Sequence, residues 1–153
     1  MRWIADIVMR RRARALFARL APHLPRAGTI ADIGSGTGHN AAHIQRQTAL
    51  CVCEFDVADM HWIGAGPTLM PDDSIPAHDC RFSSLLMLFV LQYVESVPRL
   101  LQESRRVAEG PVIVLQSTYS GAWGRCVLRM REFFWGRGAY AVAALVRLVS
   151  GAA

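Results

Sequence analysis

The fold of this chain is decided by the stretch Ala31-Asp32-Ile33-Gly34-Ser35-Gly36-Thr37-Gly38. Before the glycines, Thr29–Ile33 is a short β-branched run that we interpret as a buried strand, and after them we expect a helix over His39–Gln47. Glycines permit a tight turn and let a ligand approach the backbone, while the loop amides and the helix N-terminus offer donors to an anionic group. The stretch therefore predicts a strand, a ligand-binding loop and a helix.

A second acidic residue follows the next predicted strand. This strand is Ala49–Phe55, and it is followed by Asp56, which lies 22 residues after Gly34. Ligands of open α/β sheets bind outside the carboxyl ends of the strands, where a carboxylate can accept both hydroxyls of a ribose. The loop, its strand context and the distal acid together predict a ribose-bearing cofactor. The alternative is a tight strand–helix turn with an unrelated surface aspartate.

The rest of the chain continues the alternation of strands and helices. Apolar spacing predicts a helix that ends before Pro25, and Ser96 is a plausible N-cap for another helix that Gly110-Pro111 ends. This order predicts an α/β fold, a Rossmann-like three-layer sandwich with a mostly parallel sheet. The further predicted elements are a helix over Arg12–Leu24, strands over Ser84–Val90 and Val112–Gln116, and a weak strand near Pro67–Met70 within the loop-rich Asp59–His78.

Length and composition indicate one globular domain. The chain has 153 residues, of which 52% are hydrophobic and 19% charged, so it is neither a disordered polar chain nor a collagen-like one. All 17 basic residues are arginine, as a GC-rich bacterial genome would produce. Residues 1–30 carry seven arginines against one acid, residues 31–109 five against ten, and residues 110–153 five against one. Because the acidic centre holds the glycine motif, we expect no nucleic-acid partner.

Cysteine usage and the chain start indicate a cytoplasmic setting. The four cysteines form no C-x-x-C pair, and the arginine-studded first 20 residues lack the apolar region of a signal peptide. No apolar run is long enough to span a bilayer. His39 and His43 have the i, i+4 spacing of metal ligands, but no third ligand is evident nearby, so we expect no metal site.

The glycine spacing is G-x-G-x-G, which disfavours an NAD or nucleotide-sugar domain with G-x-G-x-x-G. Together with four further segments, the glycine loop makes the chain similar to the class I S-adenosylmethionine-dependent methyltransferases, in the small-molecule subgroup with a Methyltransf_11-like core. The resemblance covers roughly residues 12–118. Its segments besides the loop are Val52–Val57, Asp73–Ser83, Leu86–Val94, and Leu101–Val107 followed by Gly110-Pro111.

The resemblance implies S-adenosylmethionine as the cofactor and a role for each matched position. The glycine loop would lie beneath the methionine part, Asp32 would orient that loop and the cofactor's amino group, and Asp56 would hold the ribose. Asp72 or Asp73 would lie near the adenine, and the segment Leu91–Tyr93 would face the substrate side. The implied cofactor-binding residues are Asp32, Gly34, Ser35, Gly36, Gly38, Asp56, Asp72, Asp73 and Leu91. We assign no catalytic residue, and Tyr93 and His78 are candidates for polar contacts only.

The chain also departs from the family pattern. Ser83 stands where the family commonly has aspartate, so we expect a polar contact near the methyl-transfer site to be lost. Gln92-Tyr93 replaces a frequent histidine. Residues 119–153 form a helical apolar tail, with helices expected over Trp123–Trp135 and Ala139–Val149, in place of the family's final antiparallel hairpin. This tail would line an apolar substrate lid, lie at a membrane surface, or cover the sheet face left bare.

Two functions follow from the resemblance. The first is methyl transfer from S-adenosylmethionine to a small, apolar molecule by a single-domain enzyme spanning residues 1–153. The second is a non-catalytic or truncated methyltransferase-like module that binds the cofactor or a protein partner. If the natural chain ends at Ala153, we expect a homodimer or a partner to complete the sheet; if it continues into strand-like sequence, these residues are a fragment of a longer enzyme.

Overall fold

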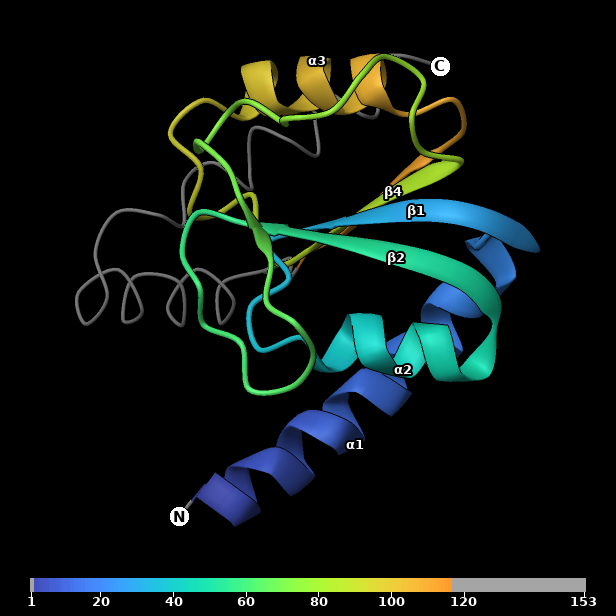
Figure 1. The fold of residues 1–153 in the computed structure, drawn as a ribbon, viewed down its shortest axis with the longest axis vertical. Helices are drawn as coiled ribbons and strands as arrows, with labels where there is room; N and C mark the ends of the chain where they lie inside the picture. Colours follow the sequence, from blue (N-terminus) through green and yellow to red (C-terminus); the bar gives the residue numbers. More distant parts are fainter. Residues whose placement is uncertain (1, 117–153) are drawn as a thin grey trace, which may run out of the picture.

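The computed structural model of the protein describes residues 2–116. Its sheet has five strands in the order β3-β2-β1-β4-β5, and every neighbouring pair is parallel. Figure 1 shows α3 on one side of this sheet and α1 and α2 on the other. The elements in chain order are α1 (Arg2–Leu20), a 3-10 turn (Ala21–His23), β1 (Ala27–Ile33), α2 (His39–Gln47), β2 (Ala49–Asp56), β3 (Thr68–Leu69), β4 (Ser84–Leu88), α3 (Val97–Val107) and β5 (Val112–Leu115).

Two hydrophobic cores, one on each face of the sheet, make the fold a three-layer sandwich. One core joins α1 and α2 to the sheet through Leu20, Ile44 and Ile30, and the other joins α3 through Leu100 and Ile33. Successive residues of a strand point to opposite faces, which is why Ile30 and Ile33 of β1 belong to different cores. A parallel sheet covered on both faces explains the continuous apolar runs of its strands. The predicted α/β architecture with a mostly parallel sheet is confirmed.

The strand order places a topological switch point beside β1. The chain runs outward from β1 to β2 and β3, then returns to the other side of β1 with β4 and β5. The ends of the three inner strands are in register, with Ile33 of β1 opposite Phe55 of β2 and Met87 of β4. The loops that follow these strands therefore diverge from one crevice, which is where α/β sheets bind ligands.

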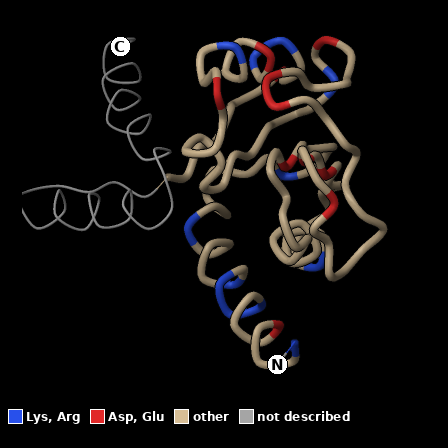
Figure 2. Tube along the Cα trace, turned by 90° about the vertical axis from the view of Figure 1, so that its left-hand side faces the viewer, with Lys and Arg blue, Asp and Glu red and all other residues tan. Residues whose placement is uncertain are grey.

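The first helix differs most from its prediction, since it begins at Arg2 rather than Arg12 and ends at Leu20 rather than Leu24. Its buried residues are Ala13, Leu16 and Leu20, whereas Trp3 is 74% exposed. In its first half Trp3, Ile4 and Val8 are exposed, so the apolar spacing that marked the second half is lost there. Figure 2 shows this helix extending from the domain with basic residues along it.

Two further differences concern the lengths of β4 and β3. The fourth strand ends at Leu88 instead of Val90, because Phe89 takes a left-handed backbone conformation with φ of +62° that no strand residue adopts. The third strand is only two residues long, inside the weak strand predicted near Pro67–Met70. Within residues 2–116 no helix is both long and apolar enough to cross a bilayer. The two tail helices and the replaced hairpin fall outside the described residues.

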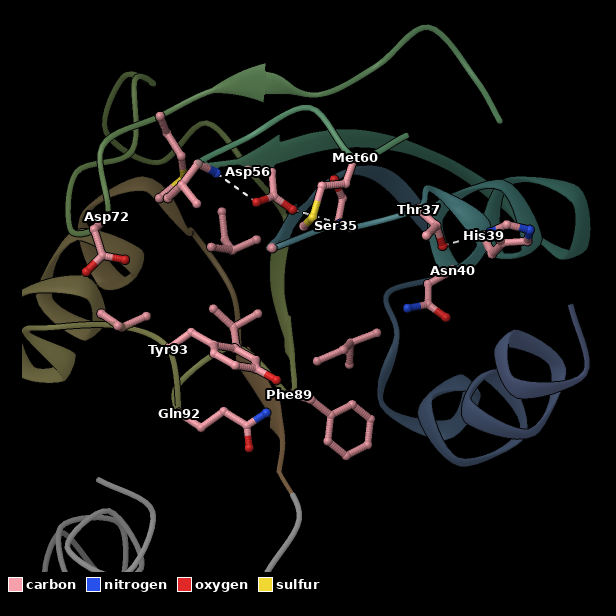
Figure 3. A pocket seen from close by; sticks show the side chains of 18 of the residues that line it. Ser35, Thr37, His39, Asn40, Asp56, Met60, Asp72, Phe89, Gln92 and Tyr93 are labelled. Carbon is pink, nitrogen blue, oxygen red and sulfur yellow. Dashed lines mark hydrogen bonds between the residues drawn. The ribbon is translucent and has the colours of Figure 1, made fainter. Parts of the chain in front are cut away.

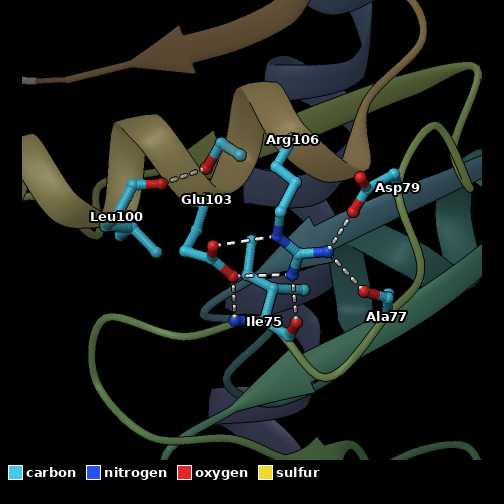
Figure 4. A network of polar contacts seen from close by, with 7 residues as sticks. Ile75, Ala77, Asp79, Leu100, Glu103 and Arg106 are labelled. Carbon is cyan, nitrogen blue, oxygen red and sulfur yellow. Dashed lines mark hydrogen bonds and ion pairs between the residues drawn. The ribbon is translucent and has the colours of Figure 1, made fainter.

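An arginine ties α3 to the segment before β4 (Figure 4). Arg106 donates to the carbonyl oxygens of Ala77 at 2.8 Å and Ile75 at 3.1 Å, and it pairs with Asp79 and Glu103. These hydrogen bonds raise the pKa of the Arg106 guanidinium, mainly through Glu103, and lower the pKa of the Glu103 carboxyl. The segment has little regular structure of its own, so this side chain supplies much of its attachment.

Replacing this arginine tests that attachment. We expect Arg106→Gln to lower the melting temperature by about 3–5 °C, because two backbone carbonyls lose a charged donor. The control is Arg105→Gln, a neighbouring exposed arginine for which the described residues show no ion pair. Thermal unfolding followed by circular dichroism measures both. Equal melting temperatures for the two variants would contradict the assigned role of Arg106.

Candidate cofactor site

A pocket of about 790 Å³ lies at the carboxyl ends of β1, β2 and β4 (Figure 3). Its lining comes from the glycine loop, the residues that follow β2 and β4, and one face of α1. Of the predicted cofactor-binding residues, five lie in this lining: Gly34, Ser35, Gly36, Asp56 and Asp72. The topology thus gathers residues separated by up to 38 positions into one crevice.

The three glycines of the loop all have left-handed backbone conformations, with φ of +71° at Gly34, +58° at Gly36 and +78° at Gly38. A Cβ at Gly34 would lie 2.3 Å from Cγ2 of Val90, so this glycine permits close packing of the loop after β4. A Cβ at Gly36 would meet only the Gly34 carbonyl oxygen, at 4.0 Å. Gly36 therefore presents bare backbone to the pocket, as a loop that cradles a ligand requires.

Gly38 has a different task, because it does not line the pocket. A Cβ there would lie 2.6 Å from the Ile63 carbonyl oxygen, in the segment that follows β2. The same segment contributes the Trp62 amide, which donates to the Thr37 carbonyl at 3.3 Å, and His61, which lies 2.7 Å from Glu54. The absence of a side chain at Gly38 lets this segment pack directly on the glycine loop.

Asp56 connects the end of β2 to the glycine loop. One carboxylate oxygen accepts the Gly36 amide at 2.8 Å and the other accepts the Val57 amide at 2.8 Å. The residue is 6% exposed yet belongs to the pocket lining. The Gly34 and Ser35 amides also donate to the Phe55 carbonyl, at 2.8 and 3.2 Å. Asp56 and the glycine loop, which the sequence predicts to bind one ligand together, thus form one hydrogen-bonded unit.

Asp32 lies deep beneath this unit. It is 1% exposed, and neither carboxylate oxygen has a hydrogen-bond partner among the described residues. Its neighbour across the sheet is Glu54, two residues before Asp56. Burial, followed by the charges of Glu54 and Asp56, raises the pKa of Asp32 to about 8. Asp32 therefore holds a proton at neutral pH, and a cationic ligand group bound beside it would stabilise its ionised form.

The raised pKa predicts an unusual pH dependence of stability. Between pH 4 and pH 8 the folded protein holds a proton on Asp32 that the unfolded chain has lost, so the free energy of unfolding falls as pH rises. The free energy of unfolding falls by up to about 1.4 kcal/mol per pH unit in this range. Asp32→Asn should remove this contribution, leaving the variant more stable than the parent at pH 8. Urea unfolding at pH 5 and pH 8 measures the change, and a parent whose stability rises over this interval while the variant's does not would contradict the assignment.

The N-terminal helix contributes a part of the site that the sequence did not reveal. Met9 and Arg12 of α1 line the pocket. The buried His39 joins the helix to the loop, because its Nε2 lies 2.9 Å from Asp6 and its Nδ1 lies 2.8 Å from the Thr37 hydroxyl. Nothing in the spacing of the arginines of this helix signals a pocket. Among the described residues, no three metal-ligating side chains lie together.

Four other residues predicted from the sequence lie outside the pocket lining: Gly38, Asp73, His78 and Leu91. Asp72 lines the pocket and accepts the Glu95 amide at 2.7 Å, whereas Asp73 pairs with Arg99 at 3.1 Å. Leu91 is fully buried in the α3 core, so its side chain does not reach the pocket, although the next two residues, Gln92 and Tyr93, do line it. Gly38, as described above, and the exposed His78 also lie outside the lining.

The expectation about Ser83 was wrong. This residue precedes β4, at the amino end of the strand, and its hydroxyl donates to the Thr29 carbonyl at 2.9 Å. It packs against Gly28 and Gly110, on the edge of the sheet opposite to the pocket. The motif alignment predicts a position near the reacting groups, but the carboxyl end of β4 lies at the pocket and Ser83 is at the amino end. A serine here therefore removes nothing from the pocket.

The residues fit a ribose-bearing ligand that carries positive charge. The bare backbone at Gly36 offers a cradle, Asp56 and Asp72 place carboxylates at its rim, and Asp32 holds a buried carboxylate without a partner among the described residues. A doubly hydroxylated sugar needs an acceptor such as Asp56, and an ammonium or sulfonium group gains from the acids.

Comparison with known proteins agrees with this chemistry. A family model described as "methyltransferase domain" (Methyltransf_23) matches residues 6–140. No curated protein matches the chain. Three similar solved structures are a candidate methyltransferase from Bacillus halodurans (TM-score 0.69, 15% identity, 89% of this chain and 67% of that one), a candidate methyltransferase of an antibiotic biosynthesis pathway from Anabaena variabilis (0.62, 19%, 84% and 53%), and a SAM-dependent methyltransferase from Aquifex aeolicus (0.57, 14%, 68% and 65%).

At these identities the structures establish the shared fold. The chain spans about half to two thirds of the length of these structures. The family model covers most of the chain, from within α1 to beyond β5. By that match and by its fold, the chain belongs to the class I S-adenosylmethionine-dependent methyltransferase family.

Proposed function

We propose that this protein binds S-adenosylmethionine and transfers its methyl group to a small, largely apolar molecule. The observation that carries the proposal is the unit formed by Asp56 and the Gly36 amide beside an open cradle. In this proposal Asp56 holds the ribose, the segment from Gly34 to Gly38 lies along the methionine part, and Asp32 orients the loop and faces the amino group.

The remaining predicted contacts belong to the adenine side. We propose that Asp72 approaches the adenine, since it lines the pocket, and that Asp73 and Leu91 support this wall from behind. The resulting site has the carboxylates of Asp56 and Asp72 in its lining, beside the bare backbone of Gly36. This distribution suits a ligand with separate cationic and hydroxyl-bearing parts.

Methyl transfer from a sulfonium requires few catalytic groups from the protein. The sulfonium of the cofactor supplies the driving force, so the chain mainly aligns the acceptor and excludes water. The acceptor side is formed by Met9, Phe89, Val94 and the exposed Tyr93. Apolar side chains dominate this wall, which supports an acceptor with a substantial apolar part. We assign no general base.

The proposed setting is the cytoplasm of a bacterium, and a second copy of the chain or another partner would complete the sheet beyond β5. Contact of the tail with a membrane surface belongs to the same proposal. Support comes from the arginine-only basic composition, the absence of C-x-x-C pairs and the apolar character of residues 119–153. Sedimentation of the chain with and without anionic vesicles separates the dimer from membrane contact.

Calorimetric titration of the full chain tests the proposal. We expect S-adenosylmethionine and S-adenosylhomocysteine to bind and NAD to give no heat. Release of S-adenosylhomocysteine in the presence of apolar acceptors then reports turnover. Failure of a folded chain to bind either sulfur compound would contradict the function, and tight binding without turnover on any acceptor would favour the non-catalytic module.

A further inference from the structure

The face of the pocket that α1 contributes contains an arginine that the cofactor assignment does not use. Arg12 lines the pocket, with its guanidinium carbon 5.0 Å from the centre of the Phe89 ring. Among the described lining residues Arg12 is the one arginine, whereas the two lining carboxylates belong to Asp56, at the end of β2, and Asp72, after β3. The pocket therefore has a positive side chain on the wall formed by α1 and negative side chains on the segments at the end of β2 and after β3.

Arg12 also lacks a carboxylate of its own within residues 2–116. Arg10 pairs with Asp6, Arg99 with Asp73 and Arg106 with Asp79, but no such pair involves Arg12. Arg12 is exposed, and a guanidinium that lies over an aromatic ring still has donors free for a bidentate interaction with a carboxylate or phosphate. Its position beside a pocket gives these donors access to a ligand.

The ring beneath Arg12 is held in an unusual way. Phe89 has a left-handed φ of +62°, a conformation that a phenylalanine adopts only when its surroundings impose it. Its amide donates to the Leu115 carbonyl at 2.8 Å, which fixes the backbone against β5. Backbone strain of this kind concentrates at ligand sites. Here it turns the chain out of β4 and places the ring in the pocket below Arg12.

We propose that Arg12, supported by Phe89, binds an anionic group, a carboxylate or phosphate, on the methyl acceptor. The proposal rests on the proposed function, and it narrows the acceptor class to apolar molecules that carry an acid. The position of the arginine favours the acceptor over the cofactor. Phe89 follows β4 and Asp56 ends β2, and β1 with its glycine loop lies between these two strands. Figure 3 shows Phe89 and Asp56 on different sides of the pocket.

The test uses the full chain saturated with S-adenosylhomocysteine and three probes: 3-phenylpropanoate, its neutral amide, and phenyl phosphate. We expect at least one of the two anions to bind at least tenfold more tightly than the amide, and the pair identifies which anion is preferred. In Arg12→Gln this preference should vanish, and in Arg12→Lys part of it should remain. The control Arg11→Gln removes an adjacent exposed charge outside the lining and should keep the full preference.

Several outcomes would overturn the inference. They are equal binding of anions and amide by the parent, failure of all three probes to bind, and an anion preference that survives in Arg12→Gln. A tenfold loss of S-adenosylhomocysteine affinity in Arg12→Gln, absent for an analogue lacking the cofactor carboxylate, would assign Arg12 to the cofactor instead. If the parent binds S-adenosylhomocysteine but shows no anion preference, the inference fails alone, whereas no binding of S-adenosylhomocysteine removes the proposed function with it.

Discussion

Replacing Asp56 by alanine should weaken S-adenosylhomocysteine binding by at least about 100-fold. The carboxylate is the proposed acceptor for the ribose hydroxyls, and two hydrogen bonds to a charged group contribute about 3–6 kcal/mol. The same carboxylate accepts the Gly36 and Val57 amides, so its removal also releases the loop that forms the cradle. Calorimetric titration of parent and variant measures the difference.

Two further variants separate these contributions. Asp56→Asn retains an acceptor oxygen for the Gly36 amide but loses the charge, and we expect an intermediate loss of affinity. Glu109→Ala removes an acid whose side chain makes no hydrogen bond or ion pair to the described residues, and it should bind like the parent. Binding by Asp56→Ala within threefold of the parent would show that the ribose is held elsewhere.

Replacing Gly34 by alanine should have the second large effect, on folding and on binding together. The left-handed backbone costs a side chain about 1–2 kcal/mol, and the new Cβ would lie 2.3 Å from Val90, where overpacking adds about 1–3 kcal/mol. We expect the free energy of unfolding to fall by about 2–5 kcal/mol. Because Val90 lines the pocket, S-adenosylhomocysteine affinity should also fall at least tenfold.

Two other glycines provide matched comparisons. Gly64 has φ of +93°, and a Cβ there would meet no atom closer than Glu54 Oε1 at 3.8 Å, outside the pocket lining. Gly64→Ala should therefore show the backbone cost alone and bind normally. Gly36→Ala should show a similar stability loss but no binding, because its Cβ would occupy the cradle. Urea unfolding and titration of the three variants measure both effects, and a Gly36→Ala variant with parental affinity would contradict the cradle.

Local pattern predicted the central part of the fold because its causes are local. The three inner strands are largely apolar, as a parallel sheet buried on both faces requires, and β1 is followed by Gly34 while β2 ends at Asp56. The same logic brought Gly34, Gly36 and Asp56 to one edge, where they line the pocket together. Their roles toward a cofactor remain predictions that the variants above test.

The differences arise where tertiary contacts override local pattern. The first half of α1 has no single apolar face, so neither its start at Arg2 nor the arrival of Arg12 in the pocket follows from its spacing. The Ser83 error has a similar origin, since motif alignment gives order along the chain but not the end of a strand at which a residue lies. The end of β4 depends on the backbone of Phe89, which is set by β5.

A crystal structure of the full chain bound to S-adenosylhomocysteine tests the central claim most directly. We predict both ribose hydroxyls within hydrogen-bond distance of the Asp56 carboxylate and the homocysteine part along the segment from Gly34 to Gly38. The account would be contradicted by a ligand bound away from the carboxyl ends of β1 and β2, or by one bound there with its ribose out of reach of Asp56.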